Sequence, residues 1–187
     1  TVEEIAAHLV AIAASRLASL AGEEGVGIEV KNEREDRAVY IVQEEPARNS
    51  EIERRIEARY PLWRLESYMT KDNGRPYLRL YILNRPDYGP PLKEGETMDF
   101  ERAADCLFFE RSAAPTKERY RSMWELMNQR EVPVVSVTDK PESDETRVMI
   151  GIHSNRAQNF LNLFSRLFDQ YRIHSNRKHR EIFSDGK

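Results

Sequence analysis

A strand-turn-strand-helix order occurs twice in these 187 residues and restricts the possible folds more than any other feature. In the first half, GVGIEV and RAVYIVQ flank the polar run KNERED, and a helix with Ile52, Ile56 and Tyr60 on one face follows. In the second half, VPVVSVT and TRVMIGIH flank DKPESDE and precede another amphipathic helix. Equivalent positions such as Val39 and Val148 lie roughly 110 residues apart, so the pattern predicts two related units and not a solenoid.

The first copy continues into a second hairpin, in which LWRLESYMT and PYLRLYILN flank the turn KDNG. Ser50 and Glu53 have the spacing of a capping box at the start of the preceding helix. A short helix at MDFERAAD and a last apolar run, CLFFE, complete the order β-α-β-β-α-β. That order predicts an α+β, ferredoxin-like unit, with an antiparallel sheet and both helices on one face.

In the second copy, Ser154 or Asn155 can cap a helix with a wide apolar face, formed by Phe160, Leu161, Phe164, Leu167, Phe168 and Tyr171. The terminal turn SDG takes the place of the first copy's DNG, so we expect the return strand to lie beyond Lys187. We therefore expect a piece of a longer protein with a truncated second unit. The predicted parts are an N-terminal helix (1–24), a first unit (25–112), and a linking helix with a second, incomplete unit (113–187).

Charge and cysteine content exclude several classes of protein. The formal net charge is −3, with acids and bases nearly balanced, so no overall field favours nucleic acid or a membrane. The most apolar stretch, IAAHLVAIAASRLASLA, is interrupted by His8 and Arg16 and is too short for a membrane span. The single Cys106 excludes an internal disulfide framework, and we expect a reducing, cytoplasmic location.

The end of the sequence resembles a known family. The segment DETRVMIGIHS, a Phe/Leu-rich helix and then LFDQYRIHSNRKHREIFSDG resemble the non-catalytic N-terminal region of large NAD-specific glutamate dehydrogenases. The pattern consists of Ser175, Arg177, Lys178, Phe183, Ser184, Asp185 and Gly186. The resemblance implies tandem ACT-type regulatory units. It also implies a catalytic domain elsewhere in the same chain, where NAD would bind.

The turn between the second copy's hairpin and its helix is the candidate effector site. Gly151 permits close backbone approach, and His153, Ser154, Asn155 and Arg156 follow it at the expected start of the helix. In ACT-type units a small effector meets the corresponding turn, so the resemblance implies an amino-acid or similar ligand here. Helix capping without any ligand is the other interpretation.

The basic stretch RIHSNRKHR provides a second set of candidates. On a regular strand, Arg172, His174, Lys178 and Arg180 would share one face. Such a face could contact phosphate or RNA, whereas a solvated sheet face is the favoured interpretation because the chain is acidic on average. Nucleic acid is therefore an unlikely partner in this interpretation.

No sequence pattern points to catalysis or to a cofactor within this chain. The glycines of GEEGVG precede a strand, whereas a dinucleotide loop follows one, so no NAD site is expected here. The four histidines show no metal-ligand spacing, and no catalytic residue is assigned. We therefore expect a regulatory or homo-oligomer-forming region, and the alternatives are a nucleic-acid-binding module or a purely structural assembly segment.

Overall fold

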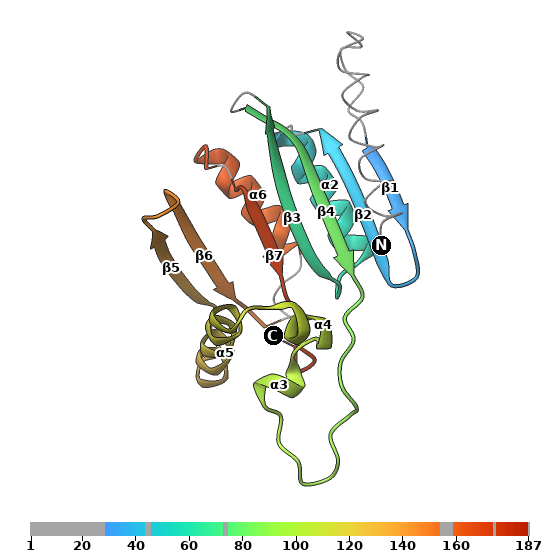
Figure 1. The fold of residues 1–187 in the computed structure, drawn as a ribbon, viewed down its shortest axis with the longest axis vertical. Helices are drawn as coiled ribbons and strands as arrows, with labels where there is room; N and C mark the ends of the chain where they lie inside the picture. Colours follow the sequence, from blue (N-terminus) through green and yellow to red (C-terminus); the bar gives the residue numbers. More distant parts are fainter. Residues whose placement is uncertain (1–28, 44–45, 73–74, 154–158, 174, 187) are drawn as a thin grey trace. The chain divides into compact units, whose positions relative to one another are not determined.

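The computed structural model describes residues 29–43, 46–72, 75–153, 159–173 and 175–186 (Figure 1). The predicted N-terminal helix, 1–24, lies outside these ranges. In chain order the elements are β1 (Glu29–Glu33), β2 (Arg37–Gln43), α2 (Pro46–Arg59), β3 (Arg64–Asp72), β4 (Arg75–Asn84), α3 (Phe100–Ala103), α4 (Cys106–Arg111), α5 (Ala114–Gln129), β5 (Val134–Lys140), β6 (Glu145–Gly151), α6 (Phe160–Gln170) and β7 (Arg177–Arg180). They belong to two units that alternate along the chain: unit 1 comprises the residues up to Arg85 with Leu161–Arg180, and unit 2 comprises Pro86–Phe160 with Glu181–Lys187.

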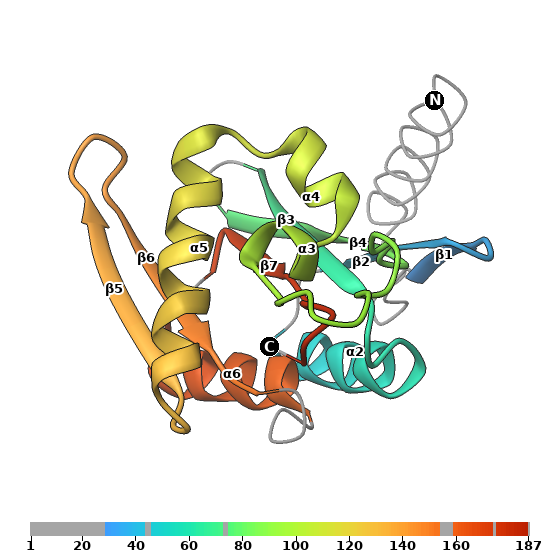
Figure 2. The ribbon, with the colours of Figure 1, turned by 90° about the horizontal axis from the view of Figure 1, so that it is seen from below.

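Unit 1 is built on a five-stranded antiparallel sheet with the order β1-β2-β4-β3-β7. Helices α2 and α6 lie on the same face of this sheet (Figures 1 and 2). Without β1, the chain order of the unit is β-α-β-β-α-β, and unit 2 is inserted between its third strand and its second helix. The short strand β7 pairs with β3 and forms one edge of the sheet.

Each face of the sheet carries a cluster of buried apolar side chains. On the helix side, Leu65, Tyr81 and Leu83 pack with the α2 residues Ile52 and Ile56 in one buried cluster. The opposite face carries a second buried cluster, formed by Val39, Ile41 and Leu78 with the half-buried Leu80. Val39, Ile41 and Leu78 are almost fully buried, so an apolar cluster lies on each face of the sheet.

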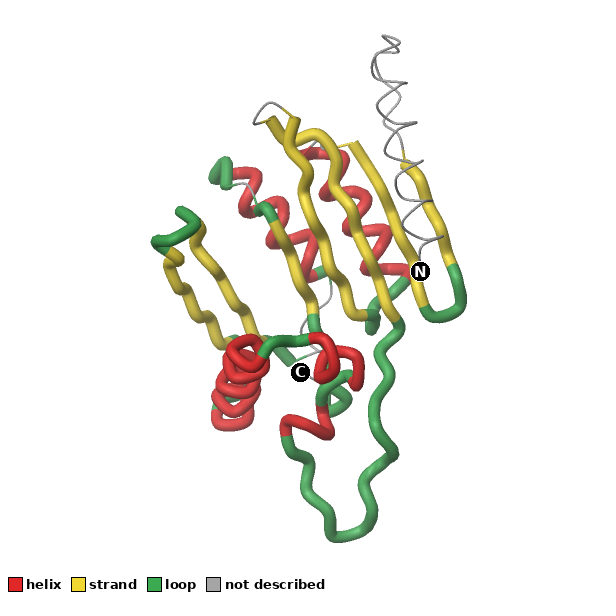
Figure 3. Tube along the Cα trace, viewed as in Figure 1, coloured by secondary structure: helices red, strands yellow, loops and turns green. Residues whose placement is uncertain are grey.

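Unit 2 contains an aromatic cluster. It also contains the hairpin of β5 and β6 (Figure 3). The cluster is centred on Phe100 and Phe108, whose rings lie edge to face, and the chain's C-terminal segment contributes Phe183 to it. The hairpin of β5 and β6 packs through Val134 and the half-buried Met149 against Met123 and Met127 of α5. Val135 and Val137 of this hairpin are exposed to more than half of their surface.

Several predicted elements are confirmed, and two details are wrong. The three hairpins, the two amphipathic helices and the linking helix all occur. Helix α2 begins at Pro46 and not at the predicted capping box, because proline is suited to the first helical position and Ser50 and Glu53 make other contacts. The run CLFFE forms α4 and not a strand, because Phe108 packs among the aromatic rings of unit 2.

The arrangement in tandem ACT-like units is not confirmed. We expected the last helix and the basic strand to belong with the hairpin at 134–151, but β7 pairs with β3 of the first sheet, Leu65 opposite Arg180 and Ser67 opposite Lys178. Within the described part of the chain, β5 and β6 pair only with each other. Units 1 and 2 therefore have other limits than the predicted ranges 25–112 and 113–187. Those ranges stay predictions of which segments fold independently. The coarser assignment to the α+β class holds.

None of the described helices is long and apolar enough to span a membrane.

Candidate functional site

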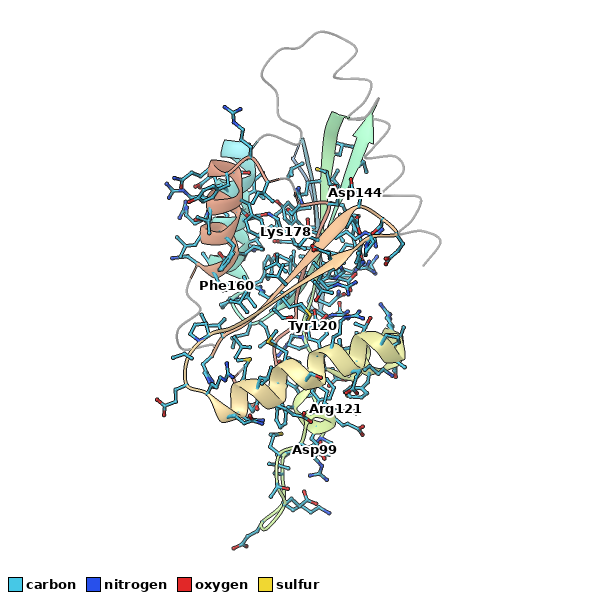
Figure 4. The ribbon with its side chains drawn as sticks, turned by 90° about the vertical axis from the view of Figure 1, so that its left-hand side faces the viewer. Asp99, Tyr120, Arg121, Asp144, Phe160 and Lys178 are labelled. Carbon is cyan, nitrogen blue, oxygen red and sulfur yellow. The ribbon has the colours of Figure 1, made fainter. Side chains whose placement is uncertain are left out.

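The layer between the helices and the sheet of unit 1 contains an unusual concentration of charged and polar side chains. We call it the buried polar cluster, and it consists of Ser50, Glu53 and Glu57 of α2, Tyr81 of β4, Asn162 and Ser165 of α6, and Lys178 and Arg180 of β7. Figure 4 labels Lys178 in this layer. Charges in such a position are stable only when they are paired and hydrogen-bonded, so their partners define what the cluster can do.

Glu53 and Lys178 form the central ion pair of the cluster. One carboxylate oxygen of Glu53 accepts from Lys178 Nζ at 2.6 Å and from the Tyr81 hydroxyl at 2.9 Å. Lys178 Nζ also donates to the Ser165 hydroxyl at 2.5 Å. The Glu53 side chain is fully buried and that of Lys178 is 15% exposed. The pair therefore fastens α2, α6 and β7 to one another inside the unit.

Glu57 performs the capping role for α6 from a distant part of the sequence. Its two carboxylate oxygens accept from the backbone N–H groups of Leu161 at 2.6 Å and Asn162 at 3.0 Å. These N–H groups belong to the second and third residues of α6, which have no partner within the helix itself. The Asn162 amide donates in turn to the Ser50 hydroxyl at 3.1 Å and to the Ser50 carbonyl. The carboxylate of Glu57 in α2 thus provides hydrogen-bond acceptors for the free N–H groups at the start of α6.

Arg180 closes the cluster at the end of β7. Its guanidinium donates to the backbone carbonyls of Tyr60 at 3.0 Å and Trp63 at 2.8 Å, and lies 3.7 Å from Glu57. Burial lowers the pKa of Arg180, and the Glu57 carboxylate opposes this shift. The loop after α2 is thereby held against the sheet edge.

The stability of the chain should depend on pH through Glu57. Burial raises the pKa of its carboxyl above the ordinary value of 4.5, although the N–H groups of Asn162 and Leu161 and the charge of Arg180 lower it. The folded state therefore holds this proton more tightly than the unfolded state, so the stability contributed by Glu57 is present below pH 4.5 and lost as the pH rises through the raised pKa. The free energy of unfolding of the wild type minus that of Glu57→Gln should fall over this range in urea titrations.

Glu51 offers a matched control on the same helix. It is exposed, and its hydrogen bond with Arg54 lowers its pKa, so the difference between wild type and Glu51→Gln should change with pH in the opposite direction and weakly. Equal pH profiles for the two variants would contradict the assignment.

The structure describes three of the four predicted basic-strand residues and places them in two different settings. Lys178 and Arg180 share the face that points to the helices and form ion pairs with Glu53 and Glu57, respectively. Arg172 is exposed in a turn after α6, with a backbone φ of 56°, and His174 lies outside the described residues. The prediction of a regular strand over 172–180 is wrong, because β7 begins only at Arg177. No continuous basic face forms from these residues in the described part of the chain.

The predicted effector turn is described only at its first end. Gly151 is buried at the end of β6, and His153 is half-buried, whereas Ser154, Asn155 and Arg156 lie outside the described residues. Packing leaves no room for a side chain at Gly151, because a Cβ added there would lie 2.5 Å from Met127 Sδ and 3.0 Å from Met123 Sδ. The groups that closely approach the Gly151 backbone are therefore the methionine side chains of α5. The ligand role of the turn stays a prediction.

Replacing Gly151 with Ala should destabilise unit 2 by about 1–3 kcal/mol, as is typical when a methyl group is forced into a packed core. Met127 would have to move to accept it. Chemical denaturation measures the loss, and Gly89→Ala is the control, because nothing lies within 4 Å of a Cβ at Gly89. A loss at Gly151 no larger than that at Gly89 would contradict the packing role.

The residues that carried the family resemblance have structural roles in both units. Lys178 belongs to the buried polar cluster. Phe183 packs in the aromatic cluster of unit 2, with its ring centroid 5.7 Å from that of Phe100. Asp185 accepts from the Trp124 indole N–H at 2.9 Å. Gly186 has a φ of 86° and its N–H donates to the Phe183 carbonyl, which confirms the predicted turn.

Comparison with known proteins agrees with this pattern. Residues 28–187 match the model of a family described as the second domain of NAD-specific glutamate dehydrogenase, and the chain belongs to this family. It is 25% identical to the NAD-specific glutamate dehydrogenase of Neurospora crassa and 28% identical to a probable NAD-specific glutamate dehydrogenase of Schizosaccharomyces pombe. These alignments cover 98% and 97% of the chain. The chain spans 19% of the length of each relative. No solved structure gives a significant match.

Sequence reasoning missed the acidic and small polar members of the buried polar cluster. The sequence pattern assigns Glu53 to a capping box and gives no reason to single out Asn162 and Ser165 within an apolar helix. The available signal was the spacing of Asn162 and Ser165, which places both on one helix face three residues apart. Their partners could not be found in this way, because Glu57 and Lys178 are distant in sequence from the residues they bind.

Proposed function

We propose that this chain is a non-catalytic region of an NAD-dependent glutamate dehydrogenase, which converts L-glutamate to 2-oxoglutarate by oxidative deamination. NAD and substrate would bind to a catalytic domain elsewhere in the same polypeptide. Membership of a second-domain family supports this proposal, as does the small share of the relatives' length that the chain spans. The names of these relatives specify NAD, and we propose that NAD is also the cofactor of the full protein.

The role that we propose for the region is regulation and subunit assembly, with a small effector such as an amino acid as ligand. The observation that carries it is the buried polar cluster: its ionic groups bind one another and backbone groups, and thus hold α2, α6 and β7 in one arrangement. The chain order β-α-β-β-α-β, with both helices on one face of the sheet, supports a ferredoxin-like, ACT-related unit. Lys178 and Arg180 are largely buried and lie next to Glu53 and Glu57, which supports a structural role for these cations and not contact with RNA.

The proposed effector should raise the melting temperature of the full-length enzyme. A ligand of the folded state stabilises it by RT ln(1 + [L]/Kd), which is about 2.7 kcal/mol at a hundredfold excess over Kd. Asn155→Ala should abolish the ligand's effect while costing about 0.5–2 kcal/mol if Asn155 caps a helix. Thermal melts with a panel of amino acids and nucleotides, for wild type and variant, separate the two effects.

Three outcomes decide between the candidate roles. If no compound stabilises the wild type, the sensing role fails and assembly alone remains. If Asn155→Ala responds like the wild type, the ligand binds at another site. Binding of RNA that weakens steeply with salt would favour the alternative of a nucleic-acid module, because phosphate contacts release counterions.

A further inference from the structure

Helix α6 of unit 1 buries polar residues and exposes leucines, which is the reverse of the usual arrangement. Asn162 and Ser165 are buried in the layer between the helices and the sheet. Leu163 and Leu167, on another side of the same helix, are 57% and 44% exposed. A surface helix normally turns its apolar side to the core, so the exposed leucines mark a surface on which something else packs.

Contacts within unit 1 fix the rotation of α6 about its own axis. The Glu57 carboxylate accepts from the N–H groups at the start of the helix. The Asn162 amide donates to the Ser50 hydroxyl at 3.1 Å, and the Ser165 hydroxyl accepts from Lys178 Nζ. Turning the leucines toward the sheet would break these contacts around buried charges, which is costly. The leucines therefore stay on the outer side.

The exposed apolar residues of α6 follow one line along the helix. Leu163, Leu167 and Tyr171 are spaced by four residues, so they lie one above the other, and Tyr171 is 66% exposed. Arg166 and Gln170 are exposed on the polar flank of this line. The helix thus has an apolar centre with a polar border on its outer side.

The turn at the end of α6 adds one more residue to this surface. Arg172 has a φ of 56°, and the Ile173 N–H donates to the Phe168 carbonyl at 2.8 Å, which is the geometry of a Schellman motif. The motif brings Ile173 back beside the last turn of the helix, where it is 51% exposed. We call Leu163, Leu167, Tyr171 and Ile173 the apolar stripe.

The spacing of the apolar stripe is symmetrical about Leu167, with Leu163 four residues before it and Tyr171 four residues after it. A two-fold axis beside Leu167 and perpendicular to the helix would place two copies of α6 antiparallel. Leu167 would then face Leu167 of the second copy, and Leu163 would face Tyr171. The antiparallel arrangement also places opposite ends of the two helix dipoles side by side.

We propose that the apolar stripe is a contact between two subunits, in which α6 packs antiparallel against α6 of a second copy of this chain. The proposal rests on the assembly role proposed above and names its surface and its partner. The exposed parts of the four side chains amount to roughly 400 Å² per copy, about half of the 800 Å² that each partner buries in a standard interface. The stripe thus provides the apolar centre of such an interface, and the flanks of the helix provide its rim.

Cysteine cross-linking of the full-length enzyme tests this arrangement. Leu167→Cys should form a disulfide between two subunits on mild oxidation, because the two-fold axis brings the two side chains together. Leu163→Cys and Tyr171→Cys should each give no link alone and should link to each other when differently tagged forms are co-expressed. Leu62→Cys is the control, since this leucine is 58% exposed in the loop after α2 and lies outside the stripe. Mass spectrometry of the linked peptides identifies which cysteines are joined.

A second variant tests whether the stripe holds the subunits together. Leu167→Glu places a charge on each side of the apolar centre and should raise the dissociation constant of the subunits by more than roughly tenfold in sedimentation experiments. Leu62→Glu should leave it unchanged. Both leucines are exposed, so neither variant should unfold the chain, and circular dichroism checks this.

The proposal and the assembly role on which it rests fail in different ways. A link between two Leu163→Cys subunits would mean parallel helices and would overturn the proposal. So would a link from Leu167→Cys to another segment of the same chain. If the enzyme is oligomeric but Leu167→Cys forms no link, the stripe is not the contact, and the assembly role must be performed by another surface. A wild-type enzyme that stays monomeric would refute the assembly role itself.

Discussion

Replacing Lys178 with Met should lower the free energy of unfolding by about 3–5 kcal/mol, the usual effect of removing one partner from a buried ion pair. Methionine has nearly the length of lysine, so the cavity would be small and the loss electrostatic. The fully buried Glu53 carboxylate would lose its cation and keep the Tyr81 hydroxyl on one oxygen, while its other oxygen has no hydrogen-bond partner within the described structure. Urea denaturation of the purified chain measures the loss.

Two further variants show whether the loss is due to the buried charge. Glu53→Gln with Lys178→Met should recover part of the stability, because no uncompensated charge remains in the interior. Arg54→Met breaks the exposed pair of Arg54 with Glu51 on the same helix and should cost less than about 1 kcal/mol. A cost for Lys178→Met as small as that for Arg54→Met would show that the pair does not hold the layer together.

The second large effect is expected in unit 2. Phe108 is 2% exposed, with ring centroids 5.1 Å from Tyr120, 5.8 Å from Phe109 and 6.3 Å from Phe100. Phe108→Ala should therefore cost about 3–5 kcal/mol, as is typical for a buried aromatic ring. The fluorescence of Trp124 reports this unit, and in a Trp63→Phe background it is the only tryptophan signal of the chain.

Phe109→Ala is the matched control for this prediction. Phe109 belongs to the same cluster and is only partly buried, so its loss should cost clearly less than that of Phe108. The reverse order of the two costs would mean that the centre of the cluster is misplaced.

Local features of the fold could be predicted from the sequence because local chemistry determines them. The run KDNG and the alternation of Leu78, Leu80 and Ile82 predicted the β3–β4 hairpin. The two strands pair as expected, and Asn73 and Gly74 of the turn lie outside the described residues. The turn at Ser184 and Asp185 followed in the same way from Gly186. In each case the deciding residues lie within a few positions of one another.

Helix α6 shows where such reasoning stops. Its aromatic and leucine residues predicted one broad buried face, and Leu161 is indeed buried, but Leu167 and Tyr171 are exposed. Asn162 and Ser165 are buried instead, because Glu57 neutralises the helix start and Lys178 meets the serine hydroxyl. Apolar periodicity cannot reveal a helix face whose partners are charges supplied from elsewhere in the chain.

The pairing of β7 with β3 was missed for a related reason. A repeated strand-turn-strand-helix order suggested that each copy completes its own sheet, and pattern alone gives no means of assigning a final strand to a distant edge. The side chains contain the information: Lys178 and Arg180 match Glu53 and Glu57, two cations two residues apart on a strand facing two carboxylates one helical turn apart.

The interleaving of the two units also has a consequence for synthesis on the ribosome. Unit 1 receives its edge strand only when residues 177–180 have emerged, long after Arg85. At roughly 5–20 residues per second, the nascent chain waits on the order of 5–20 s with the edge of β3 open and Glu53 without its lysine. During that interval the growing polypeptide presents an unpaired strand, which is the kind of surface that chaperones bind and that promotes aggregation between neighbouring chains.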